Sequence, residues 1–120
     1  MRIWAQNVLR LGMLRDRQAR LHMREARHRI ALVVPGGVDR TGEYRVIPAL
    51  LSLLERLATR FHVDVFALTQ ETRPAQWDLH GTRIHNIGVR ATRPRAVVAI
   101  MREHADRPFT LVHSIFSGAC

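Results

Sequence analysis

The hydrophobic pattern predicts four strands and two helices between residues 30 and 116. Ile30–Val34 is a short, β-branched apolar run, which is typical of a strand buried on both faces of a parallel sheet. Three later apolar runs are also predicted as strands, at residues 62–68, 83–87 and 109–116. The alternation of strands with helical segments predicts βαβ crossovers and therefore an α/β fold.

Two segments between these runs carry apolar residues at helical spacing. The first has one apolar stripe, formed by Val46, Leu50, Leu53, Leu54, Leu57 and Ala58. Because proline is tolerated only in the first turn, this helix should begin near Tyr44–Val46 or bend at Pro48. The second helix should begin at Pro94 after a Thr92 cap and end near Asp106.

The polar stretch Thr69–Thr82 is predicted as a long connection between strands. The last predicted strand, 109–116, is followed only by a small-residue turn at Gly118. A parallel domain would continue there into a helix that covers one face of the sheet. We therefore expect residues 30–120 to be a partial domain.

Charge is distributed unevenly along the chain. All 19 basic residues are arginine and the net charge is +9, of which residues 1–29 carry +6 and residues 30–120 carry +3. Because the excess lies in the leader and no aromatic platform accompanies it, nucleic acid is not expected as a partner. Cys120 is the only cysteine, which excludes an intrachain disulfide and favours a reducing, cytoplasmic compartment.

The basic leader, residues 1–29, has apolar residues at helix-like spacing with arginines between them. Two interpretations remain open: a solvated or disordered basic helix, and a peripheral membrane helix on an anionic lipid surface. A secretory signal is disfavoured because no uninterrupted apolar core is present. Translation from Met23 would leave residues 1–22 unmade.

A glycine-rich loop, Pro35–Glu43, follows the first predicted strand. Gly37 and Gly42 have the spacing of a Walker loop, but Glu43 and Tyr44 replace the required Lys and Ser/Thr. The dinucleotide fingerprint G-x-G-x-x-G is also absent. Two interpretations remain open: a backbone cradle for a ligand phosphate, assisted by Arg40, and a plain strand-to-helix turn.

The order of these motifs resembles the amino-terminal domain of family 4 glycosyltransferases of the GT-B fold. The loop is followed by R-x-x-x-A-L-x-x-L-x-x-R-L-A, and then by a basic residue and histidine before a valine-rich strand at Arg60–Val65. Pro108–Phe116 is similar to that family's fourth strand, although Thr110 stands at its usual acidic position and Ile115 at its second histidine. The resemblance covers residues 29–120.

This resemblance implies a Rossmann-like parallel sheet of about four strands with flanking helices, which is half of a GT-B fold. It implies retaining transfer of a sugar from a nucleotide-sugar donor to a glycan, lipid or small-molecule acceptor, without a cofactor or bound metal. The carboxyl-terminal domain, which holds most of the donor, is not present in these 120 residues. We therefore expect the isolated chain to be inactive.

The resemblance also assigns roles to residues. It places Gly36 and Gly37 beside the donor phosphates, and His113 at the cleft, where it would orient an acceptor hydroxyl. The neighbouring loop residues would contact donor or acceptor; these are Arg40, Thr41, Gly42 and Glu43. For Arg40 and Glu43, a solvated charge pair is the structural alternative.

A stand-alone binding module of the flavodoxin or receiver type uses the same βαβ order and is the alternative function. A receiver requires paired acidic residues after its first strand and an aspartate at its third. Here Pro35–Gly37 occupies the first place and Ile87-Gly88 follows the third strand, which disfavours a receiver. A downstream reading frame that encodes a second Rossmann half with an E-x7-E pattern would favour the glycosyltransferase over the stand-alone module.

Overall fold

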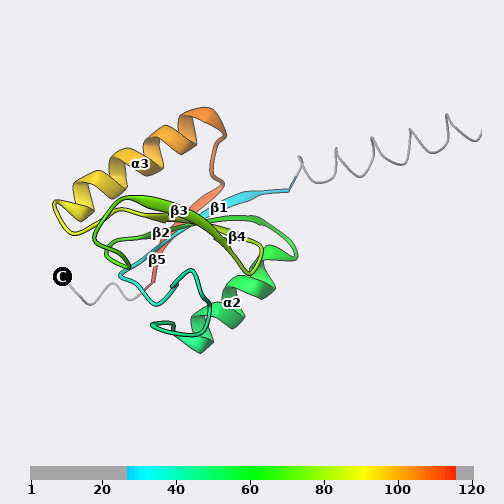
Figure 1. Ribbon diagram of the computed structural model, residues 1–120. Helices are drawn as coiled ribbons and strands as arrows, with labels where there is room; N and C mark the ends of the chain where they lie inside the picture. The colour runs from blue at the N-terminus through cyan, green and yellow to red at the C-terminus, as the bar shows by residue number, and fades with distance from the viewer. Residues whose placement is uncertain (1–26, 116–120) are drawn as a thin grey trace, which may run out of the picture.

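The computed structural model describes residues 27–115. It is an α/β fold in which a five-stranded mixed sheet is flanked by two helices (Figure 1). In chain order the elements are β1 (Arg29–Val34), α2 (Pro48–Ala58), β2 (His62–Ala67), β3 (Ala75–Leu79), β4 (Thr82–Asn86), α3 (Thr92–Asp106) and β5 (Leu111–Ser114). The predicted leader lies almost wholly outside the described residues, so its two interpretations stay predictions.

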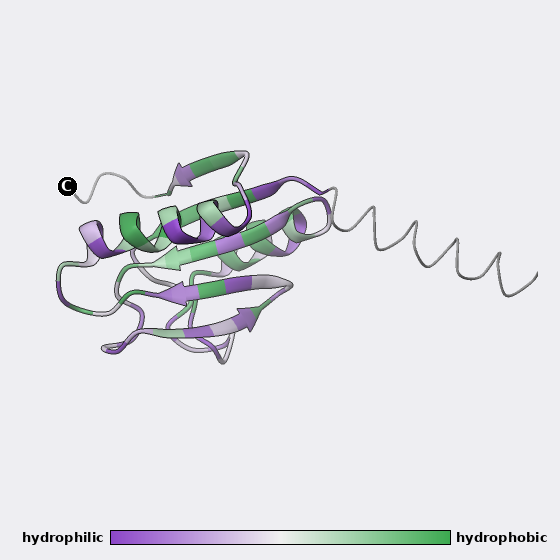
Figure 2. Cartoon of the chain, turned by 90° about the horizontal axis from the view of Figure 1, so that it is seen from above, coloured by the Kyte–Doolittle hydropathy of each residue, from purple (hydrophilic) through white to green (hydrophobic). Residues whose placement is uncertain are grey.

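The strand order in the sheet is β3-β4-β2-β1-β5. Strands β4, β2, β1 and β5 are parallel, whereas β3 runs antiparallel to β4 at the edge (Figure 2). The parallel strands therefore follow the order third, second, first and fourth, as in doubly wound dinucleotide-binding folds. Helices α2 and α3 lie on opposite faces of the sheet, so the arrangement is consistent with a Rossmann-like fold (Figure 1).

The prediction of about four strands, all parallel, was wrong in one respect. Strand β3 lies within the stretch predicted as a loop, Thr69–Thr82, and makes the sheet mixed. Its signal is a short alternation, because Ala75, Trp77 and Leu79 are the less exposed residues. The turn that joins β3 to β4, His80-Gly81, has positive φ at both residues and thus forms a tight hairpin.

Both helices are present, with starts that differ from the prediction. Helix α2 begins at Pro48, whose fixed φ and missing N–H suit the first helical position. The expected start at Tyr44–Val46 is instead extended chain, because Val46 pairs with Val38 in an isolated antiparallel bridge. Helix α3 begins at Thr92, so Thr92 is not its cap and Pro94 lies at the third helical position.

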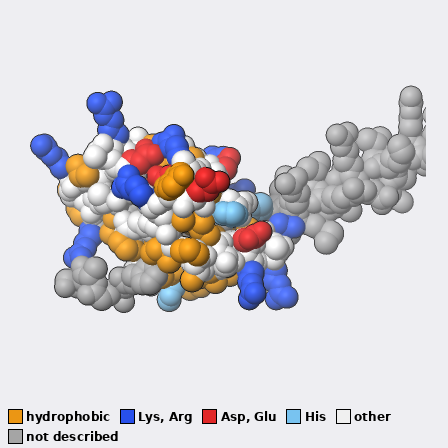
Figure 3. All heavy atoms as spheres, turned by 60° about the horizontal axis from the view of Figure 1, so that its bottom comes forward, with side chains coloured by type: hydrophobic (Ala, Val, Ile, Leu, Met, Phe, Trp, Pro, Cys, Tyr) orange, Lys and Arg blue, Asp and Glu red, His pale blue; other side chains and the backbone are white. Residues whose placement is uncertain are grey.

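Strand β5 is poorly covered. It pairs with β1 alone and all four of its residues are exposed, with Leu111 54% and Val112 49% accessible. By register, Leu111 shares the α2 side of the sheet with Ile30. Figure 3 shows hydrophobic side chains at the surface on that side of the molecule. This part of the sheet therefore presents an apolar edge that a further chain segment or a partner would bury.

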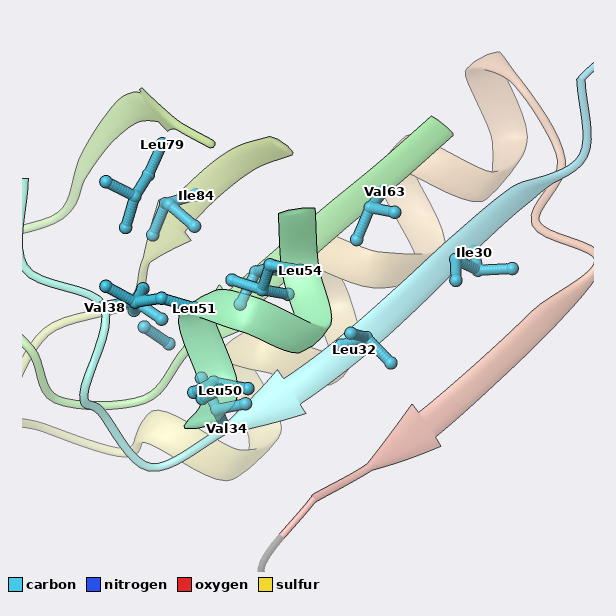
Figure 4. Close-up of a cluster of buried hydrophobic side chains, with 12 residues drawn as sticks. Ile30, Leu32, Val34, Val38, Leu50, Leu51, Leu54, Val63, Leu79 and Ile84 are labelled. Atoms are coloured by element: carbon cyan, nitrogen blue, oxygen red, sulfur yellow. The ribbon is translucent and has the colours of Figure 1, made fainter. Parts of the chain in front are cut away.

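Alternation along β1 divides the core into two layers. Ile30, Leu32 and Val34 face α2, and the layer they join is drawn in Figure 4. Ala31 belongs to the α3 layer, which also contains Phe66, Ile87, Ala96 and Phe109. Because both faces of β1 and β2 are buried, these strands are mostly apolar, with Arg29 at the start of β1 and Asp64 within β2 as the charged exceptions. None of the helices in residues 27–115 is long and apolar enough to cross a membrane.

Candidate functional site

The loop after β1 and the loop after β2 meet at the carboxyl edge of the parallel strands. Their contact is made by Gln70, a buried side chain whose Oε1 accepts hydrogen bonds from two backbone amides. The N–H of Gly37 lies 2.7 Å from this oxygen and the N–H of Val38 lies 3.0 Å from it. The glycine loop therefore does aim consecutive amides at one acceptor, and in this structure that acceptor is a protein side chain.

Asn86, the last residue of β4, fixes the loop after β2. Its Oδ1 accepts from the N–H groups of Gln70 at 2.9 Å and Glu71 at 3.1 Å. Its side-chain amide donates to the carbonyls of Glu71 at 2.9 Å and Arg73 at 2.7 Å. Since Asn86 is itself buried, three strand ends are tied together by one satisfied polar network.

The paired glycines differ in what the fold requires of them. Gly37 has φ +85°, and a Cβ there would lie 2.6 Å from the Ile47 side chain. Gly36 has no such φ, and its Cβ would meet the Gln70 Oε1 at 3.3 Å. The structure thus places both predicted phosphate-loop residues at the carboxyl edge and gives Gly37 a structural reason to be glycine.

Gly37→Ala should therefore destabilise the protein by about 2–3 kcal/mol, through the left-handed backbone and the overlap with Ile47. Gly36→Ala is the matched control and should cost less than about 1 kcal/mol, because its Cβ would lie 3.3 Å from the Gln70 Oε1 and no positive φ is involved. Urea unfolding followed by circular dichroism measures both. Equal losses would show that backbone conformation at Gly37 is not what matters.

Arg40 pairs with Glu71 and not with Glu43. Its guanidinium forms a bidentate ion pair with Glu71, with both N–O distances 2.7 Å, and its Cζ lies 4.8 Å from the centre of the Trp77 ring. Trp77 in turn donates its Nε1–H to the Val38 carbonyl at 3.1 Å. The Arg40–Glu43 pair considered from the sequence is therefore not formed, and Arg40 joins the glycine loop to the loop after β2.

The tip of the loop is a tight turn built on Asp39. Gly42, with φ +70°, donates its N–H to the Asp39 carbonyl at 3.0 Å. The Thr41 hydroxyl donates to the Asp39 carboxylate at 2.8 Å, and this hydrogen bond lowers the pKa of Asp39. Thr41 and Gly42 thus shape the turn, while Glu43 is exposed and contributes its backbone N–H to the Thr41 oxygen at 3.3 Å.

Within residues 27–115, no hydrogen bond or ion pair joins His113 to the glycine loop. It lies opposite Leu32 in the β1–β5 register, before the end of the strand, and its side chain is exposed. The carboxyl ends of β1 and β5 flank the point where the strand order reverses, which is where ligands bind in open α/β sheets. Gly36 and Gly37 follow β1 at that point, and His113 borders it from β5.

Sequence reasoning missed a second polar cluster, buried on the α3 side. The Asp64 carboxylate accepts from Arg29 Nε at 2.9 Å and contacts His85 Nε2 at 2.7 Å. Arg29 also reaches Glu103 of α3 at 2.7 Å, and its guanidinium lies over the Phe109 ring. The only signal in the sequence was an aspartate inside an apolar strand, His62–Ala67.

Burial disfavours the charged form of Asp64, but hydrogen bonds from His85 and Arg29 outweigh it. They hold the pKa of Asp64 below its usual range. The cluster links β1, β2, β4 and α3, and within it the positive Arg29 pairs with the negative Asp64 and Glu103. Within residues 27–115, no group of three or more His, Cys, Asp or Glu is arranged to hold a metal ion.

No protein-family model, curated protein or solved structure matches this chain.

Proposed function

We propose that this chain is the amino-terminal, acceptor-side half of a retaining GT-B glycosyltransferase that transfers a sugar from a nucleotide-sugar donor. The observation that carries the proposal is the position of the glycine loop. It follows β1 beside the reversal of strand order between β1 and β5. In open α/β sheets that crevice is the place for a nucleotide or sugar ligand.

The direction of the loop amides supports a role in binding the donor pyrophosphate. The N–H groups of Gly37 and Val38 converge on one oxygen, the Gln70 Oε1. Backbone amides that converge in a glycine loop form a concavity suited to an anion. We infer that a phosphate oxygen of the donor takes the place of the Gln70 oxygen when the ligand binds.

The sparse cover of β5 supports a second part of the site on another segment or chain. His113 is exposed, and Leu111 and Val112 are about half accessible. In the proposed enzyme, a carboxyl-terminal Rossmann domain forms the opposite wall of the cleft and binds most of the donor. His113 then faces the acceptor, a glycan, a lipid or a small molecule, and orients the attacking hydroxyl.

Titration of the ¹⁵N-labelled chain with UDP-glucose and GDP-mannose tests the binding half of the proposal. We expect weak, saturable shifts at the amides of Gly36, Gly37 and Val38, because residues 27–115 supply one wall of the proposed site. Glucose without the nucleotide is the control and should leave these amides unchanged. Absence of shifts there, or larger shifts elsewhere, would contradict the proposed donor loop.

Activity and gene structure test the catalytic half. The chain alone should transfer no sugar, so measurable turnover would contradict the need for a second domain. A reading frame that continues beyond Cys120 into a second Rossmann half with an E-x7-E pattern would support the enzyme. A stop codon directly after Cys120 in a verified gene would favour the stand-alone flavodoxin-like or receiver-like module instead.

A further inference from the structure

A pocket of about 640 Å³ lies between α3 and the hairpin of β3 and β4. Its volume falls within the range of about 300–1,000 Å³ that is usual for small-molecule sites. Apolar surface comes from Ile87, a buried residue that directly follows β4, and from Val98 and Ala99 of α3. The pocket lies on the α3 side of the sheet, and none of its lining residues belongs to the glycine loop.

The charged residues that line this pocket are all basic. Its eleven lining residues include Arg95 and Arg102 and no Asp or Glu. Neither arginine forms an ion pair with a described residue, and the Arg95 side chain donates only to the Arg90 carbonyl, at 3.2 Å. Arg95 and Arg102 are seven residues apart, so they lie about 10 Å apart along the helix, on the same side as Val98.

Two other polar side chains of the pocket, His85 and Asn86, already have hydrogen-bond partners. His85 holds its Nε2 against Asp64 at 2.7 Å, and its ring stacks on Phe66 at 4.6 Å. The Asn86 side chain is used by the loop after β2. Gln76 is neutral, so the two arginines are the charged groups of the pocket that are available for an anion, and the apolar Val98 and Ala99 lie between them on the helix.

We propose that this pocket binds a small organic anion, namely a carboxylate, sulfonate or phosphate ester with an aromatic or aliphatic body. The apolar body packs on Ile87, Val98 and Ala99, and the charged group pairs with Arg95 or Arg102. An arginine–anion hydrogen bond in a partly apolar site is stronger than one between neutral groups. This proposal is independent of the proposed sugar transfer, because it uses a different face of the sheet.

The test uses the fluorescent anion 1-anilinonaphthalene-8-sulfonate with the full chain, whose folded state is verified by near-ultraviolet circular dichroism. We expect saturable binding at one site. The uncharged analogue N-phenyl-1-naphthylamine should bind at least about tenfold more weakly, and Arg102→Gln should weaken the sulfonate by about tenfold or more. Arg56→Gln, on the opposite face in α2, is the charge control and should change affinity less than about twofold.

A matched pair on α3 separates the pocket from the exposed helix surface. Val97 and Val98 are 55% and 48% exposed, and only Val98 lines the pocket. Val98→Asp should abolish saturable binding because it puts a negative charge between the two arginines, while Val97→Asp should leave it nearly unchanged. Equal effects of the two variants, equal affinity for the uncharged analogue, or no saturable binding to the unmodified chain would overturn the proposal.

Discussion

Asp64→Asn should lower the free energy of unfolding by about 3–5 kcal/mol, the cost of breaking a buried ion pair by removing one partner. The Asp64 carboxylate is buried and accepts from both Arg29 and His85. The asparagine amide would turn a donor toward one of these two donors. Glu103 remains as the second partner of Arg29, so the loss should fall at the lower end of the range.

The pH dependence follows from the lowered pKa of Asp64. Because the carboxylate is more acidic in the folded than in the unfolded protein, its stabilising contribution is fully present above the unfolded pKa of about 3.9. That contribution is lost as pH falls through the folded pKa. The stability difference between the unmodified protein and Asp64→Asn should therefore shrink as pH falls from 5 to 3.

Urea unfolding at pH 7, 5, 4 and 3 measures this difference. Asp78→Asn is the matched control, because Asp78 also pairs with an arginine, at 3.4 Å, but both side chains are exposed. Asp78→Asn should lower the free energy of unfolding by less than about 1 kcal/mol at every pH. A similar loss for the two variants, or a difference that grows in acid, would contradict the buried ionic link.

The fold was largely readable from the sequence because both faces of the central strands are buried. Ile30–Val34 appears as a continuous apolar run, and His62–Ala67 as a mostly apolar run interrupted by Asp64. Strand β3 was missed because an edge strand needs only one inward row, and its alternation is only five residues long within a polar stretch predicted as a loop. The start of α2 was misplaced because Val46 fits the helical stripe but pairs with Val38 across the loop.

The site was less readable, because its partners come from distant loops. The glycines at 36 and 37 indicate a turn after a strand, and this turn could be predicted from the sequence alone. The residue that fills the loop, Gln70, lies 33 positions from Gly37 and has no local signature. The ion pair of Arg40 with Glu71 spans 31 positions for the same reason. Such contacts depend on the strand order, which only the folded sheet defines.

Gln70→Leu should lower the free energy of unfolding by about 2–4 kcal/mol, since a buried donor left without a partner costs about 1–3 kcal/mol, and the Val38 amide is buried while that of Gly37 is part-buried. Leucine keeps the volume of the side chain but removes the Oε1 that accepts from Gly37 and Val38. Gln70→Glu is the control, because its carboxylate can still accept from both amides, and it should retain most of the stability. Urea unfolding at pH 7 measures both variants.

The same position connects stability to the proposed donor site. Gln70→Ala removes the resident acceptor and leaves space beside the amides of Gly37 and Val38. If those amides bind the donor pyrophosphate, millimolar inorganic pyrophosphate should raise the melting temperature of Gln70→Ala more than that of the unmodified protein, because ligand that binds only the folded state stabilises it by mass action. Gln70→Glu should show the smallest increase in melting temperature, because its own carboxylate already accepts hydrogen bonds from these amides. The same increase in all three proteins would place the anion elsewhere and leave the loop as a plain structural turn.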